Sequence, residues 1–139
     1  MKLTVGFQVN LKIKEAISMV EKATRKGLKD TITDIANDTI KGSPVDTGNN
    51  RRSIRYEVGP GLEGAVYSTS GYGGWLEVGT PPHVITVKTA KVLTDGKTFF
   101  GKSVNHPGTK PHPYFKPALD KNIGKLPQNI KTSLETKWQ

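Results

Sequence analysis

The clearest pattern of apolar and polar positions lies near the N-terminus, where aliphatic side chains recur at helical spacing. These positions are Ile13, Ile17, Val20, Leu28, Ile32, Ile35 and Ile40. Lysine and aspartate fall mostly off this stripe, as expected for a helix with one face on a core and the other in water. The pattern predicts an amphipathic helix over residues 11–41. We expect it to be weakened or bent at Gly27 and ended by the Gly-Ser-Pro sequence at 42–44.

The middle of the chain predicts an antiparallel sheet. Residues 59–113 hold 16 of the 24 glycine and proline residues. Alternating segments predict strands at Ile54–Val58, Ala65–Ser68 and His83–Lys88, and a hairpin in which 91–93 and 98–100 flank an Asp-Gly turn. Because no helix-length crossover separates these strands, we expect antiparallel pairing. The glycine-rich sequence around Tyr72 and Trp75 is expected to be a flexible turn.

A second helical pattern fills the C-terminal segment. Pro117 suits the first turn of a helix, and the apolar residues after it keep helical phase. They are Leu119, Ile123, Leu126, Ile130, Leu134 and Trp138. Because Gly124 and Pro127 lie within this pattern, we expect the helix over 117–138 to be kinked or broken near Gly124.

Together these elements predict one α+β domain over residues 1–139. It consists of a long N-terminal helix, an antiparallel β-sheet with a long basic hairpin loop over about 53–113, and a C-terminal helix. A chain of 139 residues is long enough for one modest hydrophobic core and not for two.

Composition narrows the class of protein. Lys and Arg number 21 against 12 Asp and Glu, and cysteine is absent. The lack of cysteine excludes disulfides, thiol nucleophiles and Cys-ligated metals, and it fits a reducing compartment. No apolar run approaches the roughly 20 residues that span a bilayer, and we expect no signal peptide. A soluble, basic, single-domain protein is therefore expected.

The positive charge is concentrated in the C-terminal part. Residues 81–139 carry ten lysines against three acidic residues, and no arginine. Lysine is a flexible point charge, which suits attraction to phosphates better than the reading of base edges. These side chains either meet DNA or only keep the surface solvated. The candidates for facing DNA are Lys88, Lys91, Lys97, Lys102 and Lys110.

Aromatic residues are interleaved with these lysines. Phe99, Phe100, Tyr114 and Phe115 form either a stacking platform for single-stranded nucleic acid or the inner face of a hairpin, and we favour the inner face. No helix-turn-helix, zinc-finger or RNA-recognition pattern accompanies them.

Catalytic patterns are weak. The Asp-Thr-Gly sequence at 46–48 is also that of aspartic proteases, but the two arginines that follow favour an ordinary ionised Asp46. Asp46 or Thr47 is better interpreted as the cap of a short helix that begins near Gly48. His106 and His112 lack a third metal ligand nearby. We therefore expect no enzyme, and no catalytic, cofactor-binding or metal-binding residue.

Three segments, in order, resemble one family. They are Ser43–Ile54 (SPVDTGNNRRSI), Trp75–Thr80 (WLEVGT) and His106–Leu119 (HPGTKPHPYFKPAL). Together they resemble the tailed-phage tail-component family named after gene product ten of a lambdoid coliphage, over roughly residues 10–125. Asn50 departs from the pattern, since the family usually has an apolar residue there. Tyr114-Phe115 also departs from it, because the family more usually has one aromatic and one aliphatic residue at these two positions. The motif positions are Pro44, Asp46, Thr47, Gly48, Glu77, Gly79, Thr80, His106, Pro107, Gly108, Pro113, Phe115 and Pro117.

The resemblance implies a structural virion protein of the phage or prophage head–tail junction: a head–tail connector, tail-completion or neck protein. Such a protein assembles as a homo-oligomeric ring around the DNA channel, in the virion and in the host bacterial cytoplasm during assembly. Its implied partners are copies of itself, phage head-completion, connector and tail proteins, and passing double-stranded DNA bound non-specifically, with no membrane and no catalysis.

In these terms Gly79–Pro82 and His106–Pro113 would be the two roots of a long projecting loop, with its lysines facing the channel or a neighbouring ring. The amphipathic helices and exposed aromatics would supply subunit contacts. Two alternatives stay open: a tail terminator that caps the tail tube, and, from another class, a small basic non-specific DNA-binding protein.

Overall fold

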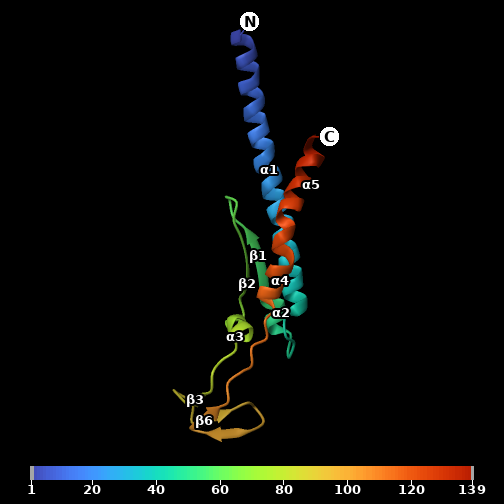
Figure 1. The fold of residues 1–139 in the computed structure, drawn as a ribbon. Coiled ribbons are helices and arrows are strands. Elements are labelled where there is room, and N and C mark those ends of the chain that lie inside the picture. Colours follow the sequence, from blue (N-terminus) through green and yellow to red (C-terminus); the bar gives the residue numbers. More distant parts are fainter. Residues whose placement is uncertain (1, 139) are drawn as a thin grey trace.

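The computed structural model describes the backbone of residues 2–138 and the side chains of residues 13–136. Long helices occupy one end of an elongated molecule and a projecting loop occupies the other (Figure 1). The elements in chain order are α1 (Lys2–Gly42), α2 (Asn49–Ser53), β1 (Ile54–Val58), β2 (Gly64–Ser68), α3 (Gly73–Val78), β3 (His83–Thr86), β4 (Leu93–Thr94), β5 (Phe99–Gly101), β6 (Ser103–His106), α4 (Phe115–Asn122), the 3₁₀ turn η1 (Ile123–Lys125) and α5 (Leu126–Trp138). The α+β class, the long N-terminal helix, the antiparallel pairing of the strands and the C-terminal helix are as predicted.

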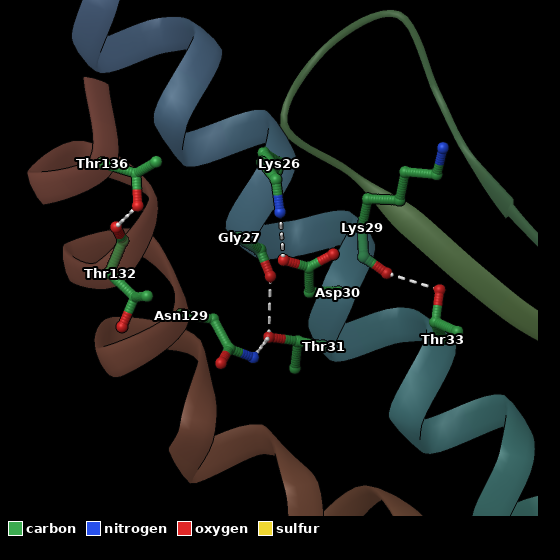
Figure 2. Close-up of polar contacts among 9 residues, drawn as sticks. All are labelled: Lys26, Gly27, Lys29, Asp30, Thr31, Thr33, Asn129, Thr132 and Thr136. Carbon is green, nitrogen blue, oxygen red and sulfur yellow. Dashed lines mark hydrogen bonds and ion pairs between the residues drawn. The ribbon is translucent and has the colours of Figure 1, made fainter.

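Helix α1 extends further towards the N-terminus than the predicted start at residue 11, and it ends at the expected Gly-Ser-Pro sequence. It continues through Gly27, which is buried at the crossing with α5. A Cβ at Gly27 would lie 2.6 Å from Ile130, so the absence of a side chain lets the two helices approach closely. Beside this crossing, Asn129 of α5 donates to the hydroxyl of Thr31 over 2.9 Å, and that hydroxyl donates to the carbonyl of Gly27 (Figure 2).

The apolar stripe of α1 is only partly covered. Ile32 and Ile35 are buried and form the core with Ala118 of α4, and Leu28, Val58 and Val66 pack against it. Further up the helix the stripe is about half exposed at three positions: Ile13, Ile17 and Val20. The prediction that the whole stripe faces the core is therefore wrong for its N-terminal part.

The strands form three separate two-stranded ribbons rather than one sheet, and all three are antiparallel. Strands β1 and β2 have nearly the predicted bounds and place Tyr56 opposite Val66. Strands β4 and β5 form the predicted hairpin around the Asp-Gly turn. Strand β6, which sequence analysis missed, pairs with β3. The expected flexible turn at 71–75 is also wrong, because helix α3 begins at Gly73.

The C-terminal helix is broken where predicted. Helix α4 begins two residues before Pro117 and gives way to η1 around Gly124, after which α5 carries Pro127 in its first turn. The predicted apolar stripe is wrong for α4 and the start of η1, where Leu119 and Ile123 are nearly half exposed. The buried residues of α4 are the smaller Ala118 and Asn122, because α4 packs closely beside α1.

Candidate functional site: the basic loop and its root

The candidate site is a projecting loop and the segments that hold it. We call residues 83–106 the basic loop, and residues 79–82 with 107–113 its root. The loop lies at the end of the molecule away from the two chain termini (Figure 1). Sequence analysis placed the two root segments together, and the structure brings them side by side.

The root is built from two Gly-Thr pairs that face each other. The backbone N–H of Thr80 donates to the carbonyl of Thr109 over 3.0 Å, and the backbone N–H of Thr109 donates to the carbonyl of Thr80 over 3.0 Å. Their hydroxyl oxygens are 3.2 Å apart. The preceding residues, Gly79 and Gly108, have φ angles of 74° and 84°, in the region that favours glycine.

Close backbone approach also requires these glycines. A Cβ at Gly79 would lie 2.5 Å from the carbonyl oxygen of Thr109, and a Cβ at Gly108 would meet the carbonyl oxygen of Thr80. Real Cβ atoms do not approach backbone this closely, so the two glycines permit the bridge that closes the loop. A repeated Gly-Thr in two motifs was a signal for this contact that sequence analysis did not use.

Glu77 fastens the root to the body of the molecule. Its Oε2 accepts from the backbone N–H of Tyr114 over 2.7 Å and of Phe115 over 2.9 Å, and its Oε1 accepts from Lys116 over 3.0 Å. These donors are the otherwise unpaired N–H groups at the start of α4. Burial raises the pKa of the Glu77 carboxyl, but the three N–H groups together lower it by more, so the pKa lies below its usual value.

Two histidines stack where the root meets the loop. The rings of His83 and His106 are 4.9 Å apart and face each other across β3 and β6. His83 donates through Nδ1 to the carbonyl of Pro81 over 2.9 Å, because a carbonyl can only accept. His106 accepts through Nδ1 from the N–H of Gly108 over 3.0 Å. Each ring is thus tied to its own root segment.

The five candidate lysines lie on the loop and its root and are all exposed. None of them forms an ion pair with any side chain of residues 13–136; the ion pairs found there involve lysines of the helices. Asp95, the only carboxylate from residue 79 to 113, accepts the N–H of Thr98 and Lys97 at the hairpin turn. The loop therefore presents unneutralised positive charge.

The aromatic residues do not form the inner face of a hairpin as favoured. Phe99 is 75% exposed and Phe100 is 42% exposed. Tyr114 is 2% exposed and belongs to the body, where its ring contacts that of Phe115 at 4.7 Å. The prediction fails because Phe100 only lines an open groove between the two ribbons of the loop and Phe99 lies outside that groove, so the hairpin encloses neither side chain.

Asn50 lies in a fully satisfied polar cluster that the sequence did not reveal. Its Nδ2 donates to Ser43 over 3.0 Å and to the Tyr114 hydroxyl over 2.8 Å. Its Oδ1 accepts from Ser68 and Ser70, each over 2.8 Å. The two departures from the family pattern, Asn50 and Tyr114, are thus hydrogen-bonded to each other.

The first motif lies apart from the basic loop. Gly48, at φ 78°, takes the N-cap position of α2 without a side-chain cap, so the predicted capping by Asp46 or Thr47 is wrong in its geometry. Thr47 instead accepts from the N–H of Asn49 over 3.4 Å, and Asp46 is exposed. Arg51 of the same motif donates to two carbonyls at the end of α1.

The other residues of the third motif lie in the root and at the start of α4. Pro107 and Pro113 lie in the returning root segment, and Phe115 and Pro117 lie in the first turn of α4. Within the described residues, no three His, Asp or Glu side chains come together as a metal site. No helix in the described part of the chain is both long and apolar enough to cross a membrane.

Comparison with known proteins gives no relative. The chain matches no family model, no curated protein and no solved structure.

Proposed function

We propose that this chain is a structural subunit of the head–tail junction of a tailed phage or prophage. In this proposal it assembles as a closed ring around the DNA channel, with the basic loop directed towards DNA and no catalytic step. The resemblance of three ordered motifs supports the family, and the structure supplies physical support of its own.

The observation that carries the proposal is the size of the exposed surface. A compact monomer of this mass exposes about 7,100 Å², whereas this chain exposes 10377 Å². Among the described side chains, large apolar residues are about half exposed or more on α1, at Ile13, Ile17 and Val20, and on the basic loop, at Phe99. Large apolar residues left open over several elements favour a subunit whose surface is covered by neighbours.

The basic loop supports the DNA-facing role. Five exposed lysines without internal partners create a diffuse positive potential, which is all that sequence-independent attraction to a sliding duplex requires. The double Gly-Thr bridge and the Glu77 contacts hold this charge at a fixed place relative to the body. A rigid root suits a channel lining, because the loop keeps its position as DNA passes.

The test separates assembly from DNA attraction. Replacing Lys88, Lys91 and Lys102 with serine removes three charges from exposed positions. We expect the variant to keep the molar mass of the wild type and to lose at least tenfold in duplex DNA affinity at low salt, with a shallower dependence of the affinity on salt. The matched control replaces three exposed lysines of the helices, Lys22, Lys29 and Lys131, and should change the affinity less.

Two results would contradict the proposal. Loss of the oligomer in the loop variant would mean that the lysines serve subunit contacts. Tight duplex binding by a wild-type protein that stays monomeric would favour the small DNA-binding protein instead.

A further inference from the structure

A groove on the basic loop is open and apolar. Its volume is about 400 Å³, and it lies between the two ribbons of the loop. The apolar lining consists of Ile85, Leu93, Phe100, Val104 and Pro107. The groove is open to solvent at the end of the projecting loop, so a side chain of another molecule can reach it.

An exposed aromatic side chain lies next to this groove without lining it. Phe99 is 75% exposed and is the most exposed of the large apolar residues in the described part of the chain. Its neighbour Phe100 lines the groove. The same loop thus carries an apolar side chain with nothing to cover it and an apolar groove with nothing to fill it.

The charges around both features are complementary. Asp95, the only carboxylate from 79 to 113, lines the groove. The N–H groups of Thr98 and Lys97 lower the pKa of its carboxyl, which keeps it ionised. Lys97 precedes Phe99 by two residues, is exposed, and has no ion-pair partner among the described side chains. Two such basic loops repel each other except where the lysine of one approaches the carboxylate of the other.

We propose that the groove lined by Phe100 receives the Phe99 side chain of a second copy of this chain, with the Lys97 of that copy beside Asp95. This inference rests on the proposed ring and names one of its subunit contacts. A contact between two different patches is heterologous, so it repeats from copy to copy and closes a ring when the rotation allows. One phenyl side chain buried in one groove covers far less than the roughly 1,000 Å² that a stable interface needs. The contact therefore sets the register of neighbouring loops within a wider interface.

The absence of cysteine permits a direct test. One preparation carries Phe99→Cys and a second carries Val104→Cys, so that a disulfide between the two variants joins different molecules. We mix them under mild oxidation, at a concentration where light scattering detects oligomers of the wild type. The mixed disulfide should form at least tenfold faster than with a control partner, Leu62→Cys, whose position on the β1–β2 turn is exposed and distant in the fold. Leu93→Cys, in another wall of the groove, repeats the test should Val104→Cys fold poorly.

Each other outcome overturns the inference. Two results would contradict the heterologous contact but not the ring. In the first, the disulfide forms equally fast with the control partner. In the second, disulfides form mainly between two Phe99→Cys chains. A wild type that is monomeric at every concentration would remove the ring as well. If Phe99→Ser keeps the wild-type mass but abolishes binding of an oligothymidylate, and Val84→Ser does not, then Phe99 is a stacking platform for single-stranded DNA.

Discussion

At the residue scale, the most informative position is Asn50, which is 3% exposed and uses both donor and both acceptor positions of its side chain. A buried amide is tolerated only when its hydrogen bonds are satisfied. Here the partner across the cluster is the Tyr114 hydroxyl, which passes the chain of hydrogen bonds on to the carbonyl of Gly73. The asparagine is therefore buried without an unsatisfied donor or acceptor in its side chain.

This coupling predicts a non-additive pair of substitutions. Asn50→Leu leaves the hydroxyls of Ser43, Ser68 and Tyr114 short of a partner and should lower the free energy of unfolding by about 2 to 3 kcal/mol. Adding Tyr114→Phe to Asn50→Leu should cost less than Tyr114→Phe costs in the wild type, by about 1 kcal/mol or more. Urea unfolding of the four proteins measures this difference. Strict additivity would contradict the account of the cluster.

The cluster also marks a limit of sequence analysis. The departures at Asn50 and at Tyr114 are visible in the sequence, but 64 positions separate them. Nothing in the local pattern shows that they touch, because the contact depends on how the segment before α4 returns to the end of α1. The charge of the loop, in contrast, could be located from the sequence because it depends only on which residues lie in a turn-rich stretch.

At the element scale, periodicity predicted the helices and strands well, but it predicted poorly which faces of these elements pack against one another. The α1 and α5 helices, the β1–β2 ribbon and the break near Gly124 follow from local spacing and from glycine and proline chemistry. Which apolar face is covered does not follow from spacing. In α4, Ala118 and Asn122 are buried, while Leu119 and the following Ile123 of η1 are nearly half exposed, since close helix approach selects small side chains.

The contacts of Glu77 at the start of α4 predict how the stability of the fold depends on pH. Its carboxylate accepts three N–H groups at the start of α4, so Glu77→Gln should lower the free energy of unfolding at pH 7 by about 1 to 2 kcal/mol. The pKa of the carboxyl is lowered in the folded chain, and its stabilising contribution is therefore complete above the unfolded pKa near 4.5. It is lost as pH falls through the lower folded pKa.

The difference between wild type and Glu77→Gln should accordingly shrink as the pH falls below about 4.5. Urea unfolding from pH 7 down to the acid range measures it. Glu57→Gln, which removes an exposed carboxylate on β1, serves as the control and should change stability little at either pH. A Glu77→Gln deficit that stays constant with pH would contradict the capping role.

At the scale of the whole molecule, the chain has a small core and a large open surface. The core is a short stretch between α1, α4 and the β1–β2 ribbon, while the loop at one end and the helix tips at the other extend beyond it. Such a shape is unfavourable in a monomer, since the exposure of apolar side chains to water costs free energy. In the proposed ring, neighbours cover the apolar parts, and the loop lysines other than Lys97 remain free for DNA.

The most direct test of this account is the molar mass of the purified chain by light scattering, from low to high concentration. The account predicts a closed oligomer of one defined size, many times the 15.2 kDa of the single chain, which becomes dominant as concentration rises. A mass of 15.2 kDa at every concentration would contradict the claim that the open surface is built to be covered by copies of the same chain.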